Sequence, residues 1–217
     1  MLETLGILFA WAFLLFSSLW VLYLLVLTLA ALLPRSRGAK PPSSRRIALL
    51  IPAHNESLLI ADTVSSALGQ RYPKDRYSVL VIADNCTDDT AAKARLAGAR
   101  VHERAQNPGK GQALHEVLEL LLQEDWDAFL VMDADSHIHP DTLSELDRAI
   151  TNGQKAIQIR YGVLNPKDAT RTRAMMLSTA SFNALRPQGK TALGLSSGIY
   201  GNGFSTPWVW DPEGVQP

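Results

Sequence analysis

The chain has 217 residues, and its 21 basic and 21 acidic side chains give a formal net charge of +0. This length suits one domain with attachments, and the balanced charge gives no indication of nucleic acid as a partner. Cys86 is the single cysteine, which excludes an internal disulfide framework and is typical of a reducing compartment.

The first segment, from Thr4 to Pro34, contains no charged residue and is rich in Leu, Phe, Trp and Val. A bilayer needs about 20 apolar residues to span it, so residues 1–34 are predicted to form a single transmembrane anchor. A secretory signal peptide is the competing interpretation. It would begin with basic residues and have a shorter apolar stretch, whereas Glu3 is the only charge near this N-terminus.

Basic residues follow the apolar segment, and they are Arg35, Arg37, Lys40, Arg45 and Arg46. The positive-inside rule therefore places this side in the cytoplasm. The location expected is the cell (inner) membrane, with the rest of the chain in the cytosol, where nucleotide-activated substrates are available. Residues 35–45 are predicted to form a basic linker whose charges contact membrane lipids.

The soluble part alternates short apolar runs with amphipathic stretches. Strands are predicted at 47–51, 79–83, 99–103, 128–132 and 156–161, and helices at 57–69, 87–97, after the loop 106–111, at 140–150 and at 168–185. This order predicts an α/β fold with a mostly parallel sheet and helices on both faces. The domain is expected to cover residues 46–217.

Polar loops follow three of the predicted strands, and the segment from Leu130 to Ser136 is the most informative. Its apolar run ends in Asp133 and Asp135. Open α/β sheets bind ligands at the carboxyl ends of their strands, and Mg²⁺ is typically held by one or two carboxylates together with substrate phosphates. The alternative is an ordinary strand-to-turn junction, where Asp is common.

The same edge of the sheet is expected to hold four carboxylates, namely Glu56, Asp84, Asp133 and Asp135. Like charges so close together are unfavourable unless a cation or a hydrogen-bonding ligand compensates them. The alternative treats each acid as a helix cap or a solvated loop charge. That alternative suits Asp88 and Asp89 well, but it explains less well why four acids recur at one edge.

Two glycine-rich stretches remain. Lys110 lies between two glycines and offers a point charge for phosphate, although the pattern is not a P-loop and is also typical of a surface turn. Residues 193–204 contain four glycines in twelve positions. This stretch is either a low-complexity loop or a wall of a substrate groove that is lined by backbone.

Five motifs now stand in order along the chain: Ile51-Pro-Ala-His-Asn-Glu56, Val81-Ile-Ala-Asp-Asn-Cys-Thr-Asp88, Asn107-Pro-Gly-Lys-Gly111, Val131-Met-Asp-Ala-Asp135 and Gly201-Asn-Gly-Phe204. Their order and spacing resemble the family 2 glycosyltransferases with the GT-A fold. Membrane-bound members include cellulose, hyaluronan and poly-N-acetylglucosamine synthases. The resemblance covers about residues 46–204.

The resemblance implies a UDP-sugar donor, a glycan or lipid-linked acceptor, and Mg²⁺ or Mn²⁺ as the cofactor. Ala53, Glu56 and Asp84 would contact the uridine, with Asp84 reading the base, and Lys110 would lie near the donor. Asp133 would contact ribose or metal, and Asp135 would hold the metal that bridges the diphosphate. The acceptor side would be lined by Gly201, Asn202, Gly203 and Phe204.

The chain departs from the family pattern at the general base that inverting transfer requires. Family members carry this base as an Asp beyond the Gly-Asn-Gly segment, followed by a Gln-x-x-Arg-Trp motif and further membrane helices. The only late acids here are Asp211 and Glu213, in a Pro-containing tail. The chain is therefore interpreted as C-terminally incomplete, and its catalytic base stays unknown.

Three hypotheses follow. The first is a membrane-anchored, metal-dependent, inverting glycosyltransferase that makes cell-surface or extracellular glycan. The second is a non-catalytic subunit that binds nucleotide sugar or assists assembly, and it is motivated by the missing base. The third, a sugar-1-phosphate nucleotidyltransferase, ranks last because the Gly-rich, Arg-containing loop of that class is absent after the first strand.

Overall fold

The computed structural model describes residues 2–33, 44–164 and 169–207. The chain divides into two compact units. One comprises residues 1–37 and 160–198, and the other comprises residues 38–159 and 199–217. We call them the helical unit and the sheet unit. The predicted linker 35–45 lies almost wholly outside the described residues, so the predicted boundaries of the anchor and of the soluble domain stay predictions.

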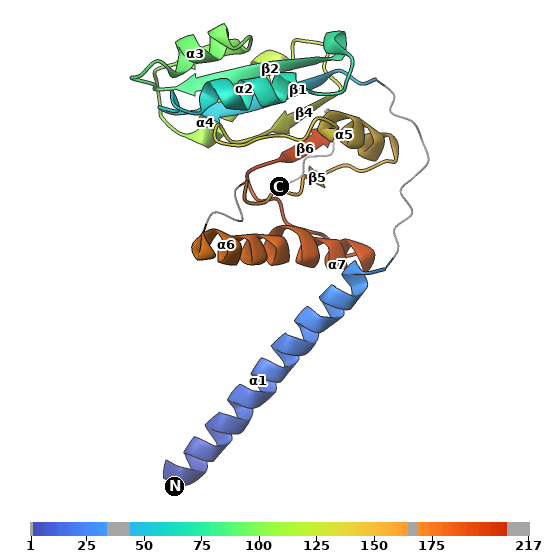
Figure 1. The fold of residues 1–217 in the computed structure, drawn as a ribbon. Helices are drawn as coiled ribbons and strands as arrows, with labels where there is room; N and C mark the ends of the chain where they lie inside the picture. Colours follow the sequence, from blue (N-terminus) through green and yellow to red (C-terminus); the bar gives the residue numbers. More distant parts are fainter. Residues whose placement is uncertain (1, 34–43, 165–168, 208–217) are drawn as a thin grey trace. The chain divides into compact units, whose positions relative to one another are not determined.

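The sheet unit contains six strands in the order β3-β2-β1-β4-β6-β5 (Figure 1). They are β1 (Ile47–Ala53), β2 (Tyr77–Asp84), β3 (Arg100–Arg104), β4 (Ala128–Val131), β5 (Ile157–Gln158) and β6 (Phe204–Pro207). Strands β1 to β4 are all parallel. The side chains of β1 are almost all buried, as expected for a strand covered on both faces. The mostly parallel α/β sheet predicted from the sequence is confirmed.

The last two strands differ from the prediction. β6 runs antiparallel to β4, with Phe204 opposite Val131, and β5 runs antiparallel to β6. The strand predicted at 156–161 shortens to two residues, and β6 was not predicted as a strand. Its sequence, Phe-Ser-Thr-Pro, is too short and too polar to show a strand period. Its place in the sheet comes from pairing with β4, which local pattern does not reveal.

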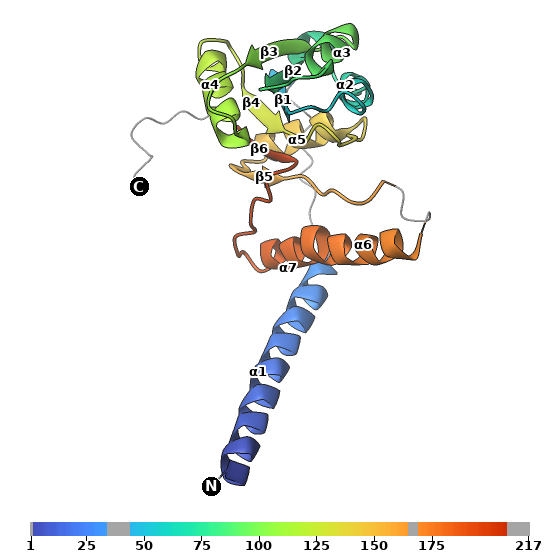
Figure 2. The same cartoon turned by 90° about the vertical axis from the view of Figure 1, so that its left-hand side faces the viewer.

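Helices cover both faces of the sheet, as predicted (Figure 2). They are α2 (Ile60–Leu68), α3 (Thr90–Leu96), α4 (Lys110–Leu121) and α5 (Thr142–Thr151), with a 3₁₀ turn, η1, at Lys74–Arg76. α2 and α5 pack on one face through a large apolar cluster. α4 packs on the other through Ala113, Val117 and Leu121, at the i, i+4, i+8 spacing of one helical face.

A buried carboxylate, Asp147 of α5, fixes the start of β1. Its side chain is fully buried, and it accepts hydrogen bonds from the Ser44 N–H at 2.8 Å and the Tyr72 hydroxyl at 2.7 Å. Arg45 Nε lies 3.5 Å from its second oxygen. Burial, and then the hydrogen bond to Asp147, raise the pKa of Tyr72. This network anchors the chain where it enters the sheet.

The helical unit begins with α1 (Leu2–Ala31), and an 18-residue stretch within its segment Glu3–Ala31 has a mean hydropathy of 2.3. By length and composition this helix is able to cross a membrane. The unit also contains α6 (Thr170–Ala180), the π turn η2 (Ser181–Leu185) and α7 (Arg186–Ala192), which follow one another without a break. The helix predicted at 168–185 thus continues past Pro187, because this proline lies in the first turn of α7, where its missing N–H is tolerated. Residue 168 lies outside the described residues.

Candidate functional site

The carboxyl ends of β1, β2 and β4 meet at one edge of the sheet. Ala53, the last residue of β1, pairs with Ala83 next to the end of β2. On its other side β1 pairs with β4, where Leu50 lies opposite Val131. The loops that follow these strands carry the motifs singled out from the sequence. The parallel order of the three strands therefore brings those motifs to the same edge.

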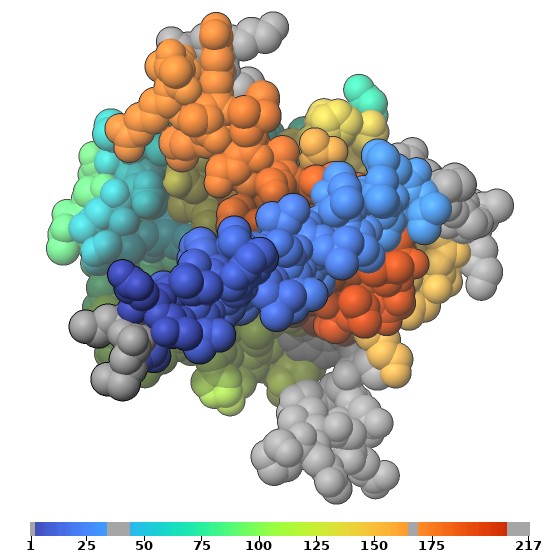
Figure 3. Space-filling view, turned by 90° about the horizontal axis from the view of Figure 1, so that it is seen from below, coloured from blue at the N-terminus to red at the C-terminus, as the bar shows by residue number. Residues whose placement is uncertain are grey.

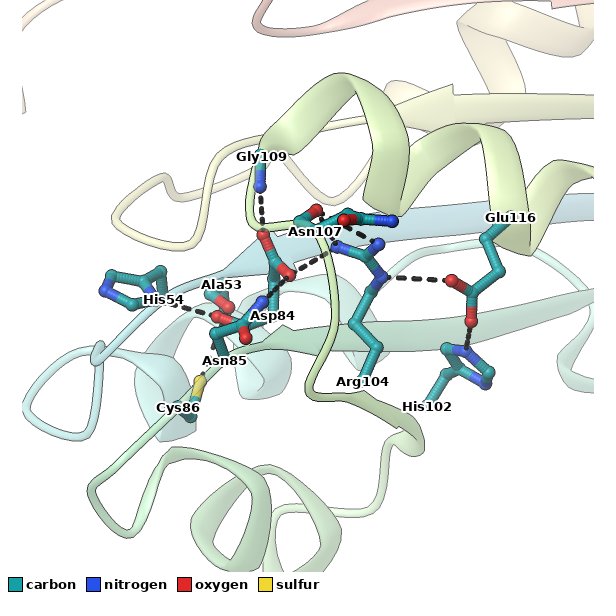
Figure 4. A network of polar contacts seen from close by, with 10 residues as sticks. All are labelled: Ala53, His54, Asp84, Asn85, Cys86, His102, Arg104, Asn107, Gly109 and Glu116. Carbon is teal, nitrogen blue, oxygen red and sulfur yellow. Dashed lines mark hydrogen bonds and ion pairs between the residues drawn. The ribbon is translucent and has the colours of Figure 1, made fainter.

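Asp84, at the end of β2, is the best-satisfied carboxylate of this edge (Figure 4). Its side chain is only 9% exposed, and it pairs with the Arg104 guanidinium. It also accepts hydrogen bonds from Gly109 N–H at 2.8 Å and Asn85 Nδ2 at 2.7 Å. Burial alone would raise the pKa of Asp84, but these three donors outweigh it and hold the pKa below its ordinary value. Asp84 is therefore an anion at neutral pH.

Arg104, the last residue of β3, connects Asp84 to a second carboxylate (Figure 4). Its Nε donates to Glu116 of α4 at 3.1 Å, and its terminal nitrogens donate to the carbonyl of Asn107. Glu116 also bonds His102 Nε2 at 2.7 Å. The hydrogen bonds from His102 and then Arg104 lower the pKa of Glu116. The sequence analysis missed Arg104 and Glu116.

The loop after β1 is attached to the loop after β2. The carbonyl of Ala53 accepts a hydrogen bond from the Cys86 thiol at 3.4 Å, and His54 Nδ1 donates to the carbonyl of Asp84 at 2.7 Å. The Glu56 N–H donates to Thr90 Oγ1 at 2.8 Å, and the Glu56 side chain is half-buried. Ala53 and Asp84 end strands β1 and β2, and Glu56 lies in the loop after β1. The three residues that the resemblance assigns to the uridine thus come from two strand ends whose following loops are hydrogen-bonded to each other.

The acidic pair after β4 has a different environment. Lys110, at the start of α4, pairs with Asp133 and also donates to the carbonyl of Gly201 at 2.8 Å. The Asp133 side chain is 39% exposed, and Asp135 is exposed. The protein's own cations therefore compensate two of the four predicted carboxylates. Among the described residues, no three His, Cys, Asp or Glu side chains gather closely enough to hold an ion between them.

The Gly201-Asn-Gly segment contacts the acidic pair directly. Asn202 Oδ1 accepts a hydrogen bond from the Asp133 N–H at 3.1 Å, and its Nδ2 donates to Ser136 Oγ at 3.0 Å. Gly201 and Gly203 have φ angles of 78° and 67°, a region that favours glycine. The segment leads directly into β6, where Phe204 packs edge-to-face on Phe129 with ring centroids 6.4 Å apart.

Gln158 of β5 holds the same segment from its other side, and it was also missed by the sequence analysis. Its Nε2 donates to the carbonyls of Asn202 at 2.6 Å and Gly203 at 3.2 Å, and its Oε1 accepts from the Tyr200 N–H at 2.9 Å. One amide side chain therefore fixes three backbone groups of the loop. Because β5 is only two residues long, this side chain supplies much of what attaches the loop to the sheet.

The chemistry of the Asp133 and Asp135 side chains fits a hard divalent cation. They offer oxygen ligands only, and Asp135 is open to solvent. Mg²⁺ sites of this type use one or two carboxylates and take their other ligands from phosphates and water. Two carboxylates that offer only oxygen, one of them open to solvent, agree with that ligand set, so the residues present fit the predicted metal.

Comparison with known proteins identifies the family of this chain. The family model for "Glycosyl transferase family 2" matches residues 48–202, and the chain therefore belongs to this family. Beta-monoglucosyldiacylglycerol synthase from Nostoc sp. is 31% identical over 165 residues, which cover 72% of this chain and 34% of that protein. Hyaluronan synthase from Streptococcus pyogenes is 27% identical over 139 residues, which cover 58% of this chain and 31% of that protein.

A solved structure supports the fold. The mannosyltransferase PcManGT from Pyrobaculum calidifontis, in complex with GDP-Man and Mn²⁺, aligns with a TM-score of 0.64 at 20% identity. The alignment covers 86% of this chain and 51% of that chain. The GT-A fold predicted from the sequence is confirmed. The chain spans about a third of the length of the curated relatives, 36% and 34% for two of them.

Proposed function

We propose that this chain forms the donor-binding part of a membrane-anchored, metal-dependent, inverting glycosyltransferase that takes a UDP-sugar. One observation carries the proposal: two polar sites lie at the same edge of the sheet, at the ends of β2 and β4, which flank β1. One is built around the buried anion Asp84 and the other around the open pair Asp133 and Asp135. A nucleoside diphosphate sugar has a base at one end and a charged diphosphate further along, which is the pairing that these two sites suit.

The base site selects by hydrogen-bond polarity. A carboxylate offers about four acceptor positions, and three donors from the chain already bond Asp84. The remaining position accepts the imide N–H of uracil. Cytosine presents an acceptor at the same ring position, so an ionised Asp84 disfavours it. Ala53, at the end of β1, and Glu56, in the loop that follows, complete the uridine side of the site.

At the diphosphate, Asp133 and Asp135 would hold Mg²⁺ or Mn²⁺. The bound ion would stabilise the negative charge that develops on the departing nucleoside diphosphate. Lys110 keeps its bond to the Gly201 carbonyl and turns its remaining donors from Asp133 toward the phosphates. Gly201, Asn202, Gly203 and Phe204 face the acceptor side. We assign no catalytic base within 2–33, 44–164 or 169–207.

The acceptor and location follow from the relatives and from α1. PcManGT was solved with a nucleotide sugar and Mn²⁺, and the Nostoc relative is named for a glucosylated diacylglycerol. We infer a glycan or lipid-linked acceptor at the membrane. The apolar segment Glu3–Ala31 would anchor the chain, and the basic residues that follow it favour a cytoplasmic active site in the inner membrane.

The test is binding of UDP to the full chain by titration calorimetry, with and without Mn²⁺. Asp135→Ala and EDTA should each abolish the metal-dependent part of the affinity. Asp75→Ala, which removes an exposed acid of η1 that pairs only with its neighbour Arg76 among the described residues, is the matched control and should bind as the wild type does. UDP binding that neither EDTA nor Asp135→Ala weakens would refute the proposal.

A turnover assay then distinguishes the glycosyltransferase from the non-catalytic binding subunit. Transfer of sugar from UDP-glucose, UDP-galactose or UDP-N-acetylglucosamine to a lipid or glycan acceptor supports the enzyme. Metal-dependent binding without transfer to any acceptor supports the non-catalytic binding subunit. The intact mass in native membranes belongs beside this assay, because a value above 23.8 kDa would show that more of the protein follows.

A further inference from the structure

The helical unit contains a second long helix that the proposed chemistry does not use. Its three parts, α6, η2 and α7, run from Thr170 to Ala192 without interruption, and we call it the crossing helix. In Figures 1 and 2 it runs crosswise to α1, over the C-terminal end of that helix. Figure 3, seen from below, shows α1 running across the picture with the crossing helix emerging on both sides of it.

A close contact fixes this position. Leu27 and Ala30, which are 2% and 6% exposed, are the buried side chains of α1, whereas most of the preceding helix is exposed. Gly189 of α7 is buried here, and a Cβ atom at Gly189 would stand 2.1 Å from the carbonyl oxygen of Leu27. Only glycine permits this approach. The crossing helix therefore lies at the level where the apolar segment Glu3–Ala31 ends.

The charge of this region has one sign. Residues 169–207 contain four basic residues, Arg171, Arg173, Arg186 and Lys190, and no acidic residue. Arg171 and Arg173 are exposed. The Arg186 guanidinium lies over the Phe182 ring at 4.0 Å, and its buried Nε has no hydrogen-bond partner within the described part of the chain. Within residues 169–207 no acidic side chain is available to balance these cations, whereas acidic and basic side chains form pairs in the sheet unit.

Apolar side chains accompany the cations. Met175, Met176, Leu177 and Phe182 are 49%, 39%, 68% and 51% exposed. A solvated helix seldom leaves four large apolar side chains open along two to three turns. Basic and large apolar residues on one helix are typical of helices that lie in the plane of a membrane interface.

We propose that the crossing helix lies on the anionic surface of the membrane that α1 spans, with Arg171 and Arg173 bound to lipid phosphates and Leu177 and Phe182 at the acyl boundary. The proposal rests on the proposed anchoring by α1. Its occupant is a lipid headgroup because the helix stands at the end of an apolar span, where phosphates of one leaflet are concentrated. Each Lys or Arg near an anionic leaflet favours docking by about fivefold.

The experiment uses the full chain in nanodiscs, with Cys86→Ser as background and one fluorophore at Leu177→Cys. Lipids that carry a nitroxide in the headgroup report contact by quenching. Discs of phosphatidylcholine are compared with discs that also contain phosphatidylglycerol. Leu96→Cys, at an exposed leucine of α3 that is 89% exposed, is the matched control. Leu15→Cys with a mid-chain nitroxide reports whether α1 is inserted.

We expect phosphatidylglycerol to increase quenching at position 177 and not at position 96. Arg171→Gln with Arg173→Gln should lower the docking equilibrium about 25-fold, two factors of about five, and restore the phosphatidylcholine value. Equal quenching at 177 and 96 in both lipids would overturn the proposal. So would protection of position 177 from both nitroxide lipid and aqueous iodide, because that pattern means contact with protein.

Two further outcomes distinguish a lipid phosphate from a free phosphate, and an inserted α1 from surface binding alone. An effect at position 177 that inorganic phosphate reproduces in phosphatidylcholine discs would identify a free-phosphate site and overturn the lipid assignment. Quenching at 177 without quenching at 15 would refute anchoring by α1 and would overturn the proposal in this form, because the crossing helix would then bind the surface of a membrane that α1 does not span. Neither result changes the metal-dependent UDP binding that tests the proposed function.

Discussion

The two acidic sites at the edge of the sheet are built in opposite ways. Asp84 is buried and already bonded by three donors of the chain, one of them the guanidinium of Arg104. Asp133 is more than a third exposed and pairs with a single flexible lysine, and Asp135 is exposed. The first site is rigid and suits recognition of a fixed shape. The second keeps its ligands open, as exchange of an ion and a diphosphate requires.

Replacing each acid by its amide should separate these two designs most clearly. Asp84→Asn removes the charge that Arg104 is buried against, so the unfolding temperature should fall by several degrees. UDP affinity should fall about ten- to a hundredfold, since a hydrogen bond to a charged group contributes about 1.5–3 kcal/mol. Asp135→Asn should leave the unfolding temperature near that of the wild type and remove only the metal-dependent binding. Thermal unfolding and calorimetry measure both effects.

A result with the reverse pattern would contradict the comparison. If Asp135→Asn lowered the unfolding temperature as much as Asp84→Asn, the metal site would also be part of the folded framework. Arg104→Gln provides a second check from the other partner. It should lower the unfolding temperature in the same direction as Asp84→Asn, because the buried Asp84 then loses its cation.

The open site is supported from outside by Gln158, and removing that support should have the next largest effect. Gln158→Leu removes the donor to the Asn202 carbonyl and the acceptor of the exposed Tyr200 N–H, whereas the Gly203 carbonyl keeps the Ile159 N–H at 2.6 Å. Each lost hydrogen bond contributes about 0.5–1.5 kcal/mol. We expect a lower free energy of unfolding and weaker Mn²⁺-dependent UDP binding. The reason is that Asn202, no longer held by Gln158, would lose its hydrogen bond to the Asp133 N–H. Calorimetry with UDP in excess Mn²⁺ gives the affinity.

Gln158→Glu is the matched variant for this prediction. It keeps the acceptor for the Tyr200 N–H but turns a carboxylate oxygen toward the Asn202 and Gly203 carbonyls, which only accept hydrogen bonds. It should therefore bind UDP at least as weakly as Gln158→Leu. Equal affinity in all three proteins would mean that the loop holds its shape without this side chain. Gln123→Leu, in the segment that follows α4, should change neither property and serves as the distant control.

The sequence predicted the acids of both sites and the strands that carry them, but it did not predict the partners of those acids. The apolar runs of β1, β2 and β4 and the acids after them were visible because strand period and turn chemistry are local. The partners of those acids were not. Arg104 belongs to a weak edge strand, and Glu116 lies on a helix, so their meeting at Asp84 depends on the strand order β3-β2-β1, which local pattern does not fix.

The same limit explains the far side of the sheet. The glycines of residues 193–204 left a low-complexity loop and a groove wall both open, and Phe204 at the end of this stretch was not predicted as a strand, yet pairing with β4 makes it one. Gln158 looked like one polar residue in a longer strand, whereas it is half of a two-residue strand and the attachment point of the Gly-Asn-Gly segment. Antiparallel pairing between segments about 45 residues apart is a tertiary choice, and residue types alone leave it open.

Removing the lysine of the open site should have a smaller and opposite effect. Lys110 occupies Asp133 in the ligand-free protein, so Lys110→Met frees a carboxylate oxygen. Affinity for Mn²⁺ alone should rise by up to about fivefold, the upper range for an exposed ion pair of about 1 kcal/mol. Affinity for UDP in excess Mn²⁺ should fall, because the phosphates lose a cation. Lys93→Met, which removes a lysine of α3 that bonds the Ser57 carbonyl, should not raise Mn²⁺ affinity.

The smallest expected effect is on the loss of stability at low pH, and it concerns the carboxylates at and after the end of β2. Hydrogen bonds from Thr90 and Ser57 lower the pKa of Asp88 from 3.8 to about 2, and the pKa of Asp84 is also lowered. A carboxylate with a depressed folded-state pKa binds its proton more readily when unfolded. Its contribution is therefore complete above the ordinary value, near pH 4, and is lost as the pH falls toward 2.

Asp88→Asn should remove part of this dependence, so the unfolding temperature of the variant should fall less steeply than that of the wild type between pH 4 and pH 2, the interval that the Asp88 shift defines. Asp89→Asn changes the neighbouring acid and should keep the wild-type slope. A wild-type slope in Asp88→Asn would mean that the hydrogen bonds from Thr90 and Ser57 do not favour the ionised carboxylate. The rigidity of this side would then rest on Asp84 and Arg104 alone.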